Sequence, residues 1–96
     1  MNLEKLLREK REQILAVAAR HGAFNLRLFG SVARGEADDK SDIDLLVTFE
    51  DGRSLFDHAS LIIELEELLA RKVDVVSDKG LRPRVRENVM RDAMPL

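Results

Sequence analysis

Apolar residues recur over residues 3–18 at the spacing of one helical face, and Glu, Lys and Arg fill most positions between them. The apolar positions on this face are Leu3, Leu6, Leu7, Ile14, Val17 and Ala18. Gly22 ends the pattern, as glycine commonly does just beyond the last turn of a helix. The pattern predicts an amphipathic helix that packs on a sheet.

Three later segments are typical of strands. Residues 24–29 form a short alternating run, and residues 73–76 form the apolar run Val-Asp-Val-Val. Residues 42–49 alternate two rows of side chains, and one row is wholly apolar: Ile43, Leu45, Val47 and Phe49. Successive side chains of a strand leave opposite faces, so the other row, which begins with Asp42 and Asp44, gives the second face an acidic end.

A further helix is predicted after the turn Asp51-Gly52, because Ser54-x-x-Asp57 has the form of a capping box. The apolar residues of this helix surround much of its circumference: Phe56, Ala59, Ile62, Ile63, Leu65 and Leu69. The surplus is either core or a stripe that faces a partner, and we expect most of these residues to be core.

The last segment, residues 80–96, predicts a final helix with Pro83 tolerated in its first turn. It is also the most basic segment, through Arg82, Arg84, Arg86 and Arg91. These arginines form either a solvated face or a surface for nucleotide phosphates or an acidic partner, and both interpretations stay open. The predicted order is helix, strand, short helical turn, strand, helix, strand and helix. This order fits a small α/β domain with a mixed sheet flanked by helices.

Composition narrows the function classes. The 96 residues suffice for one domain, residues 1–96, with one modest core. A net charge of −2 and only four aromatic residues, all Phe, argue against direct nucleic-acid binding. The absence of Cys excludes disulfides and thiolate metal sites, and the two His are too isolated to suggest zinc. No apolar run approaches a membrane span and no signal peptide is evident, so we expect a cytoplasmic protein.

The candidate chemistry begins at Gly30-Ser31, directly after the first predicted strand. A glycine there lets the backbone approach a ligand closely, and Ser31 offers a hydroxyl together with backbone amides if residues 31–34 start a short helix. Arg34 adds a charged fork suited to phosphate oxygens. A Walker A loop is excluded because Glu36 and Ala37 stand where its Lys and hydroxyl residue should be. The dinucleotide fingerprint is also absent, because no glycines fall in its register.

Three aspartates complete the candidate site. Ten residues separate Ser31 from Asp42, and Asp42 and Asp44 lie on one face of a strand, where two like charges require a cation such as Mg²⁺ or Mn²⁺. Asp74 interrupts a run of valines, where an ionised carboxylate is costly unless it is paired or metal-bound. Taken alone, each aspartate could simply lie at a solvated strand edge without a function. Asp74 could also form an ion pair with Arg71 or Lys72. The phosphate-type loop upstream favours the functional interpretation.

The order Gly-Ser, ten residues, Asp-x-Asp and a later strand Asp resembles the DNA polymerase β-like nucleotidyltransferase superfamily. Gly-Ser-x-Ala-Arg-Gly followed by Ser-Asp-Ile-Asp-Leu-Leu-Val is similar to its minimal nucleotidyltransferase (MNT) branch. The C-terminal Gly-Leu-Arg-Pro-Arg-Val-Arg-Glu segment and its Ala-Met-Pro-Leu ending resemble the MNT antitoxins of HEPN/MNT toxin–antitoxin modules. The resemblance covers nearly the whole chain and implies a small polymerase β-like domain with a mixed sheet.

The resemblance also implies roles for individual residues. Nucleotide binding is implied for Gly30, Ser31 and Arg34, and metal binding and catalysis for Asp42, Asp44 and Asp74. In this scheme two Mg²⁺ ions are held by the acids, ATP is the substrate, and Asp74 can take the proton from the acceptor hydroxyl.

By this resemblance we expect transfer of AMP from ATP to a hydroxyl group, that of a tyrosine, on a cognate HEPN toxin ribonuclease, which silences the toxin. A first alternative is a non-catalytic antitoxin that acts by steric cover. A second is a transferase for a small hydroxylated acceptor, which is weakened because a chain of this length lacks a separate acceptor-binding domain.

Overall fold

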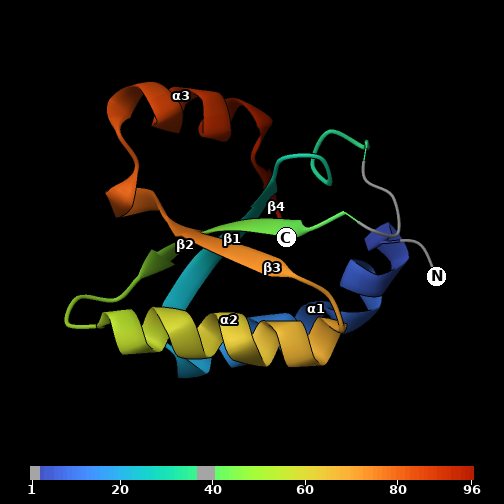
Figure 1. Ribbon diagram of the computed structural model, residues 1–96, viewed down its shortest axis with the longest axis horizontal. Helices are drawn as coiled ribbons and strands as arrows, with labels where there is room; N and C mark the ends of the chain where they lie inside the picture. Colours follow the sequence, from blue (N-terminus) through green and yellow to red (C-terminus); the bar gives the residue numbers. More distant parts are fainter. Residues whose placement is uncertain (1–2, 37–40) are drawn as a thin grey trace.

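The computed structural model describes residues 3–36 and 41–96 as two layers of helix packed on the two faces of one sheet (Figure 1). Helices α1 and α2 lie on one face of the sheet, and α3 lies over the other. The elements in chain order are α1 (Leu3–Arg20), β1 (Ala23–Phe29), β2 (Ile43–Phe49), α2 (Leu55–Leu69), β3 (Val73–Ser77), the 3₁₀ turn η1 (Asp78–Gly80), α3 (Pro83–Asp92) and β4 (Met94–Pro95).

The sheet is mixed, as the sequence predicts, and its strand order is β3-β2-β1-β4. β1 pairs antiparallel with both β2 and β4, whereas β2 pairs parallel with β3. The parallel pair requires a crossover, which α2 provides. The two-residue strand β4 was not predicted.

The hydrophobic core lies between the sheet and the helices α1 and α2. Its fully buried large side chains include Ile14 from α1, Ile43 and Leu45 from β2, and Leu61 and Leu65 from α2. The alternation of β2 is therefore as predicted, because the apolar row enters this core and the acidic row leaves the opposite face.

Helix α2 corrects one expectation. Leu65 and Leu69 are buried, but the Phe56 side chain is 83% exposed, Ile63 is 57% exposed, and Ala59 is also exposed. At about 100° per residue, Leu65 and Leu69 share one face of the helix, and the three exposed residues lie on the other side. The prediction that most of these apolar residues are core was wrong for this outward group.

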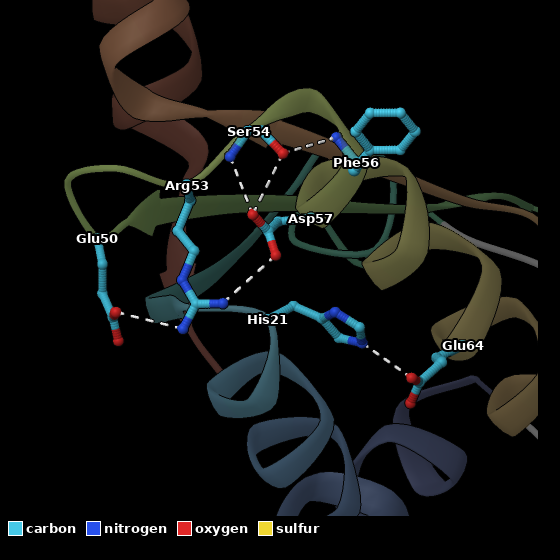
Figure 2. Close-up of polar contacts among 7 residues, drawn as sticks. All are labelled: His21, Glu50, Arg53, Ser54, Phe56, Asp57 and Glu64. Atoms are coloured by element: carbon cyan, nitrogen blue, oxygen red, sulfur yellow. Dashed lines mark hydrogen bonds and ion pairs between the residues drawn. The ribbon is translucent and has the colours of Figure 1, made fainter.

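The start of α2 is confirmed in detail (Figure 2). The Phe56 amide donates a hydrogen bond to Ser54 Oγ at 3.2 Å, and the Ser54 amide donates one to Asp57 Oδ2 at 2.9 Å. This capping box satisfies backbone amides that the first turn of a helix leaves without partners. Arg53 adds an ion pair to Asp57, with its Nη1 3.3 Å from Oδ1.

The segment after β1 is a compact turn instead of the short helix that we considered from Ser31 to Arg34. The Arg34 amide donates to the Gly30 carbonyl at 3.1 Å, and the Glu36 amide donates to the Ser31 carbonyl at 2.9 Å. Glycines with positive φ, Gly30 at 74° and Gly35 at 72°, lie at the two ends of this turn. In the residues that the structure describes, no helix is long and apolar enough to cross a membrane.

Candidate active site

The candidate site lies on the sheet face that carries α3 (Figure 1), at a position where residues of β1, β2 and β3 are paired in register. Asp44 of β2 pairs in register with Phe29, the last residue of β1, and with Asp74 of β3. Paired residues of neighbouring strands project from the same face, so the side chains of Asp44 and Asp74 are adjacent. The parallel register therefore brings together two of the three predicted acids, which are 30 residues apart in the sequence.

The proximity of Asp74 affects the titration of Asp44. Burial raises the pKa of the Asp44 carboxyl, and the charge of Asp74 and a hydrogen bond with it raise that pKa further. Asp42 adds a smaller effect in the same direction, whereas Arg34 lowers the pKa. A bound cation stabilises two carboxylates that are as close as those of Asp44 and Asp74, and their oxygen atoms suit Mg²⁺ or Mn²⁺.

Asp42 is the least integrated of the three acids. It lies one residue before β2 begins and is exposed. Asp74 is exposed as well, on the edge strand β3, so the expectation that its carboxylate is buried among valines was wrong. Within residues 3–36 and 41–96, no three His, Cys, Asp or Glu side chains are arranged so that they could hold a metal ion together. Asp44 and Asp74 therefore form the preassembled part of the predicted ligand set, and the chemistry of this pair fits a divalent cation.

Gly30 lies directly against the Asp44 carboxylate. A Cβ atom at position 30 would overlap with Asp44 Oδ2, and its φ of 74° is also unfavourable for any residue with a side chain. The predicted nucleotide turn and the predicted metal ligand are thus in contact. Glycine is required here for two independent reasons.

Arg34 projects from the same turn and is held by two carboxylates. Its Nε lies 3.1 Å from Glu36 Oε2, and its Nη1 lies 3.4 Å from Asp92 Oδ2 at the end of α3. Hydrogen bonding to Glu36, reinforced by Asp92, raises the pKa of Arg34. Sequence reasoning missed Asp92, because no local pattern links two residues that lie 58 positions apart.

A second polar group fixes the far end of the same sheet face. The Thr48 hydroxyl donates to Asp78 Oδ2 at 2.6 Å, and Arg27 Nη2 lies 3.4 Å from the same oxygen. Arg27 and Asp78 are both largely buried side chains, at 13% and 16% exposure. This group ties η1, which leads into α3, to β1 and β2.

The comparisons with known proteins agree with this geometry. The nucleotidyltransferase domain family matches residues 10–94 of the chain. The chain belongs to this family.

Two relatives of this nucleotidyltransferase domain are similar over most of their lengths. The chain is 36% identical to "Putative protein adenylyltransferase MJ0435" of Methanocaldococcus jannaschii, over 92% of the chain and 95% of that protein. It is 39% identical to "Protein adenylyltransferase MntA" of Thermococcus cleftensis, over 78% of the chain and 76% of that protein.

Solved structures confirm the fold class predicted from the sequence. The "Structure of putative minimal nucleotidyltransferase" superposes with a TM-score of 0.88 at 59% identity, covering 100% of this chain and 97% of that one. The "Crystal structure of the toxin-antitoxin with AMP-PNP" has a TM-score of 0.76 at 22% identity, covering 88% of this chain and 69% of that one, and shows the fold alone. The resemblance to minimal nucleotidyltransferases is thus confirmed.

Proposed function

We propose that this nucleotidyltransferase transfers AMP from ATP to a hydroxyl group of a partner toxin and thereby neutralises it. The observation that carries the proposal is the Asp44–Asp74 pair in contact with the Gly30 turn. The names of the relatives at 36% and 39% identity, both protein adenylyltransferases, support transfer to a protein. We further propose that the toxin is a HEPN-type ribonuclease and that a tyrosine hydroxyl is the acceptor.

Bond changes are simple in this scheme. The acceptor oxygen bonds to the α-phosphorus of ATP, the bond from that phosphorus to the bridging oxygen breaks, and pyrophosphate leaves. The proton of the acceptor hydroxyl passes to the Asp74 carboxylate, which lies beside Asp44. Asp42, Asp44 and Asp74 would hold Mg²⁺, which neutralises the phosphate charge when it is bound.

The turn after β1 would grip the triphosphate. Gly30 allows close approach of the backbone, and Ser31 offers its hydroxyl and the amides around it. Arg34 would exchange a carboxylate partner for a phosphate oxygen, since its guanidinium fits both.

Two predictions from the sequence belong to this proposal. A single domain over residues 1–96 is supported by the family match over residues 10–94. A cytoplasmic location, where ATP is available, stays a prediction.

Incubation of this chain with ATP, Mg²⁺ and a HEPN-type toxin with which it forms a complex tests the function. Intact-mass spectrometry should find the toxin heavier by adenylate units. An unmodified, folded toxin would contradict the proposal. Replacing Asp44→Asn should slow transfer by about a hundredfold or more, because a cation ligand acts directly on the developing charge. The control Asp51→Asn changes an acid whose side chain is 98% exposed and should leave the rate unchanged.

The same assay separates catalysis from steric cover. The double variant Asp42→Ala, Asp44→Ala should still form the complex but lose neutralisation if transfer is the active principle. Neutralisation that survives these substitutions would instead favour the binding antitoxin.

A further inference from the structure

Helix α3 lies over the acidic face of the sheet without an anchor in the hydrophobic core. None of its ten residues, all of which the structure describes, is buried, and its apolar residues Val85 and Met90 are 47% and 39% exposed. Helices of folded proteins are usually held in place by a buried apolar face. The position of α3 therefore depends largely on polar contacts at its two ends.

The contacts at the end of α3 lead to the turn after β1. Arg27 Nη1 donates to Met90 Sδ at 3.2 Å, and Arg34 Nη1 lies 3.4 Å from Oδ2 of Asp92, the last residue of α3. Figure 1 shows the end of α3 beside the turn after β1. Among residues 3–36 and 41–96, Arg34 is the one ion-pair partner of Asp92. This ion pair joins α3 to the turn that we propose grips the triphosphate.

The two carboxylates that hold Arg34 differ in what they fix. Glu36 belongs to the same turn as Arg34, because its amide donates to the Ser31 carbonyl, and it moves with that turn. Asp92 lies 58 positions away on another element. Asp92 therefore fixes the Arg34 side chain relative to the sheet, whereas Glu36 does not. A phosphate oxygen can replace Glu36 without detaching Arg34 from α3.

The guanidinium of Arg34 keeps donors available in this arrangement. Glu36 occupies Nε, Asp92 occupies one N–H of Nη1, and a guanidinium has five N–H groups in all. The Arg34 amide donates to the Gly30 carbonyl at 3.1 Å, and Gly30 contacts the Asp44 carboxylate, so these donors belong to the turn beside the predicted cation ligands. Ordering a long side chain before a ligand arrives lowers the entropy cost of binding.

We propose that Asp92 is a positioning residue, which holds Arg34 where its guanidinium receives the triphosphate of ATP and thereby couples nucleotide binding to the placement of α3. The inference rests on the proposed function for the identity of the nucleotide. The rival role for Asp92 is competition, in which its carboxylate occupies Arg34 at the expense of the phosphate. The two roles predict opposite changes in ATP affinity when Asp92 is removed.

Calorimetric titration with ATP and Mg²⁺ separates these roles. Asp92→Ala should weaken ATP binding about threefold or more, although it removes a negative charge that repels ATP. Glu87→Ala is the matched control, because Glu87 is an exposed acid of the same helix that makes no ion pair within residues 3–36 and 41–96. The control should bind ATP at least as well as the unmodified chain. Tighter binding by Asp92→Ala, or the same affinity as the control, would overturn the proposal.

A double-variant cycle with Arg34→Ala shows whether Asp92 acts through Arg34. Arg34→Ala alone should weaken ATP binding, and adding Asp92→Ala to it should cause no further loss. Melting temperatures of the single and double variants show whether each is folded. A further loss as large as that in the unmodified background would mean that Asp92 acts only by stabilising α3, and would overturn the proposal.

These measurements use ATP without an acceptor, so they are independent of transfer. ATP binding that Asp92→Ala weakens, together with a toxin that is never adenylated, would leave the role of Asp92 standing and remove the transfer function. Adenylation of the toxin by a chain whose ATP affinity is unchanged in Asp92→Ala would do the reverse.

Discussion

At the scale of single residues, Asp44 connects the parts of the site. Its carboxylate touches the Gly30 backbone on one side and faces Asp74 on the other. Because its pKa is raised, Asp44 binds its proton more tightly in the folded than in the unfolded chain. Without a divalent cation, stability should thus fall as pH rises from the ordinary pKa of an aspartate through the raised value. A cation that binds the ionised pair should reverse this loss.

Replacing Asp74→Asn should lower the pKa of Asp44 toward its ordinary value. The substitution removes the charge of Asp74, and burial alone is then left as the main cause of the shift. A carbon-detected NMR titration of the Asp44 carboxyl measures the change. The variant Asp51→Asn removes a fully exposed acid that pairs with Lys79 and should leave the titration of Asp44 in place. An identical Asp44 pKa in both variants would mean that the two carboxylates do not interact.

Gly30→Ala and Gly35→Ala form a matched pair. Both positions have positive φ, 74° and 72°, so each alanine should cost about 1 kcal/mol of stability through backbone strain. Only at Gly30 would the new methyl group also displace the Asp44 carboxylate, because within residues 3–36 and 41–96 no atom lies within 4 Å of a Cβ added at Gly35. The transfer rate should fall about a hundredfold in Gly30→Ala and remain near the unmodified rate in Gly35→Ala. Steady-state assays of both variants, with equal losses as the contradicting result, decide this prediction.

At the scale of elements, the sequence contains most of what decides the fold. The alternation over residues 42–49 predicted both faces of β2, and Ser54-x-x-Asp57 predicted the start of α2. Strand β4 could not be predicted, because two residues, one of them Pro95, carry no periodicity. The exposed side of α2 could not be predicted either, because apolar residues surround much of this helix and their pattern does not indicate which side packs on the sheet.

The residues of the candidate site also fall into those that local sequence predicts and those that only the tertiary structure brings together. Asp42, Asp44 and Asp74 were chosen from local spacing, and the register of β2 with β3 then brought two of them together. The pairing of Arg34 with Asp92 depends on how α3 returns over the sheet, which is a tertiary property. No local pattern encodes it.

Removing the Ser54 hydroxyl should destabilise the protein by about 1 kcal/mol, since the first turn of α2 would lose a cap for the Phe56 amide. Ser54→Ala is best compared with Ser77→Ala, because Ser77 precedes η1 and its side chain makes no capping hydrogen bond. Urea denaturation of the two variants measures the difference. A loss in Ser77→Ala as large as that in Ser54→Ala would contradict the role of the cap.

At the scale of the whole molecule, stability is concentrated between the sheet and the helices α1 and α2, where the core cluster lies. Leu65→Ala, at a fully buried position of α2, should cost about 3 kcal/mol through the cavity it leaves. Leu55→Ala, on the same helix but 84% exposed, should cost well under about 1 kcal/mol. Thermal and chemical denaturation of both variants test this, and similar losses would mean that Leu55 is covered.

The crossover from β2 through α2 to β3 also constrains how this chain can change its length. Asp74 reaches Asp44 only because β3 begins with Val73 turned into the core, where Val73 and Val75 are 1% and 6% exposed. A single residue inserted or deleted within β3, ahead of Asp74, would switch odd and even positions, burying the aspartate and expelling the valines. Tolerated insertions should therefore come in pairs within this strand, whereas the loop at Gly52 lies outside the strands and should also accept single residues.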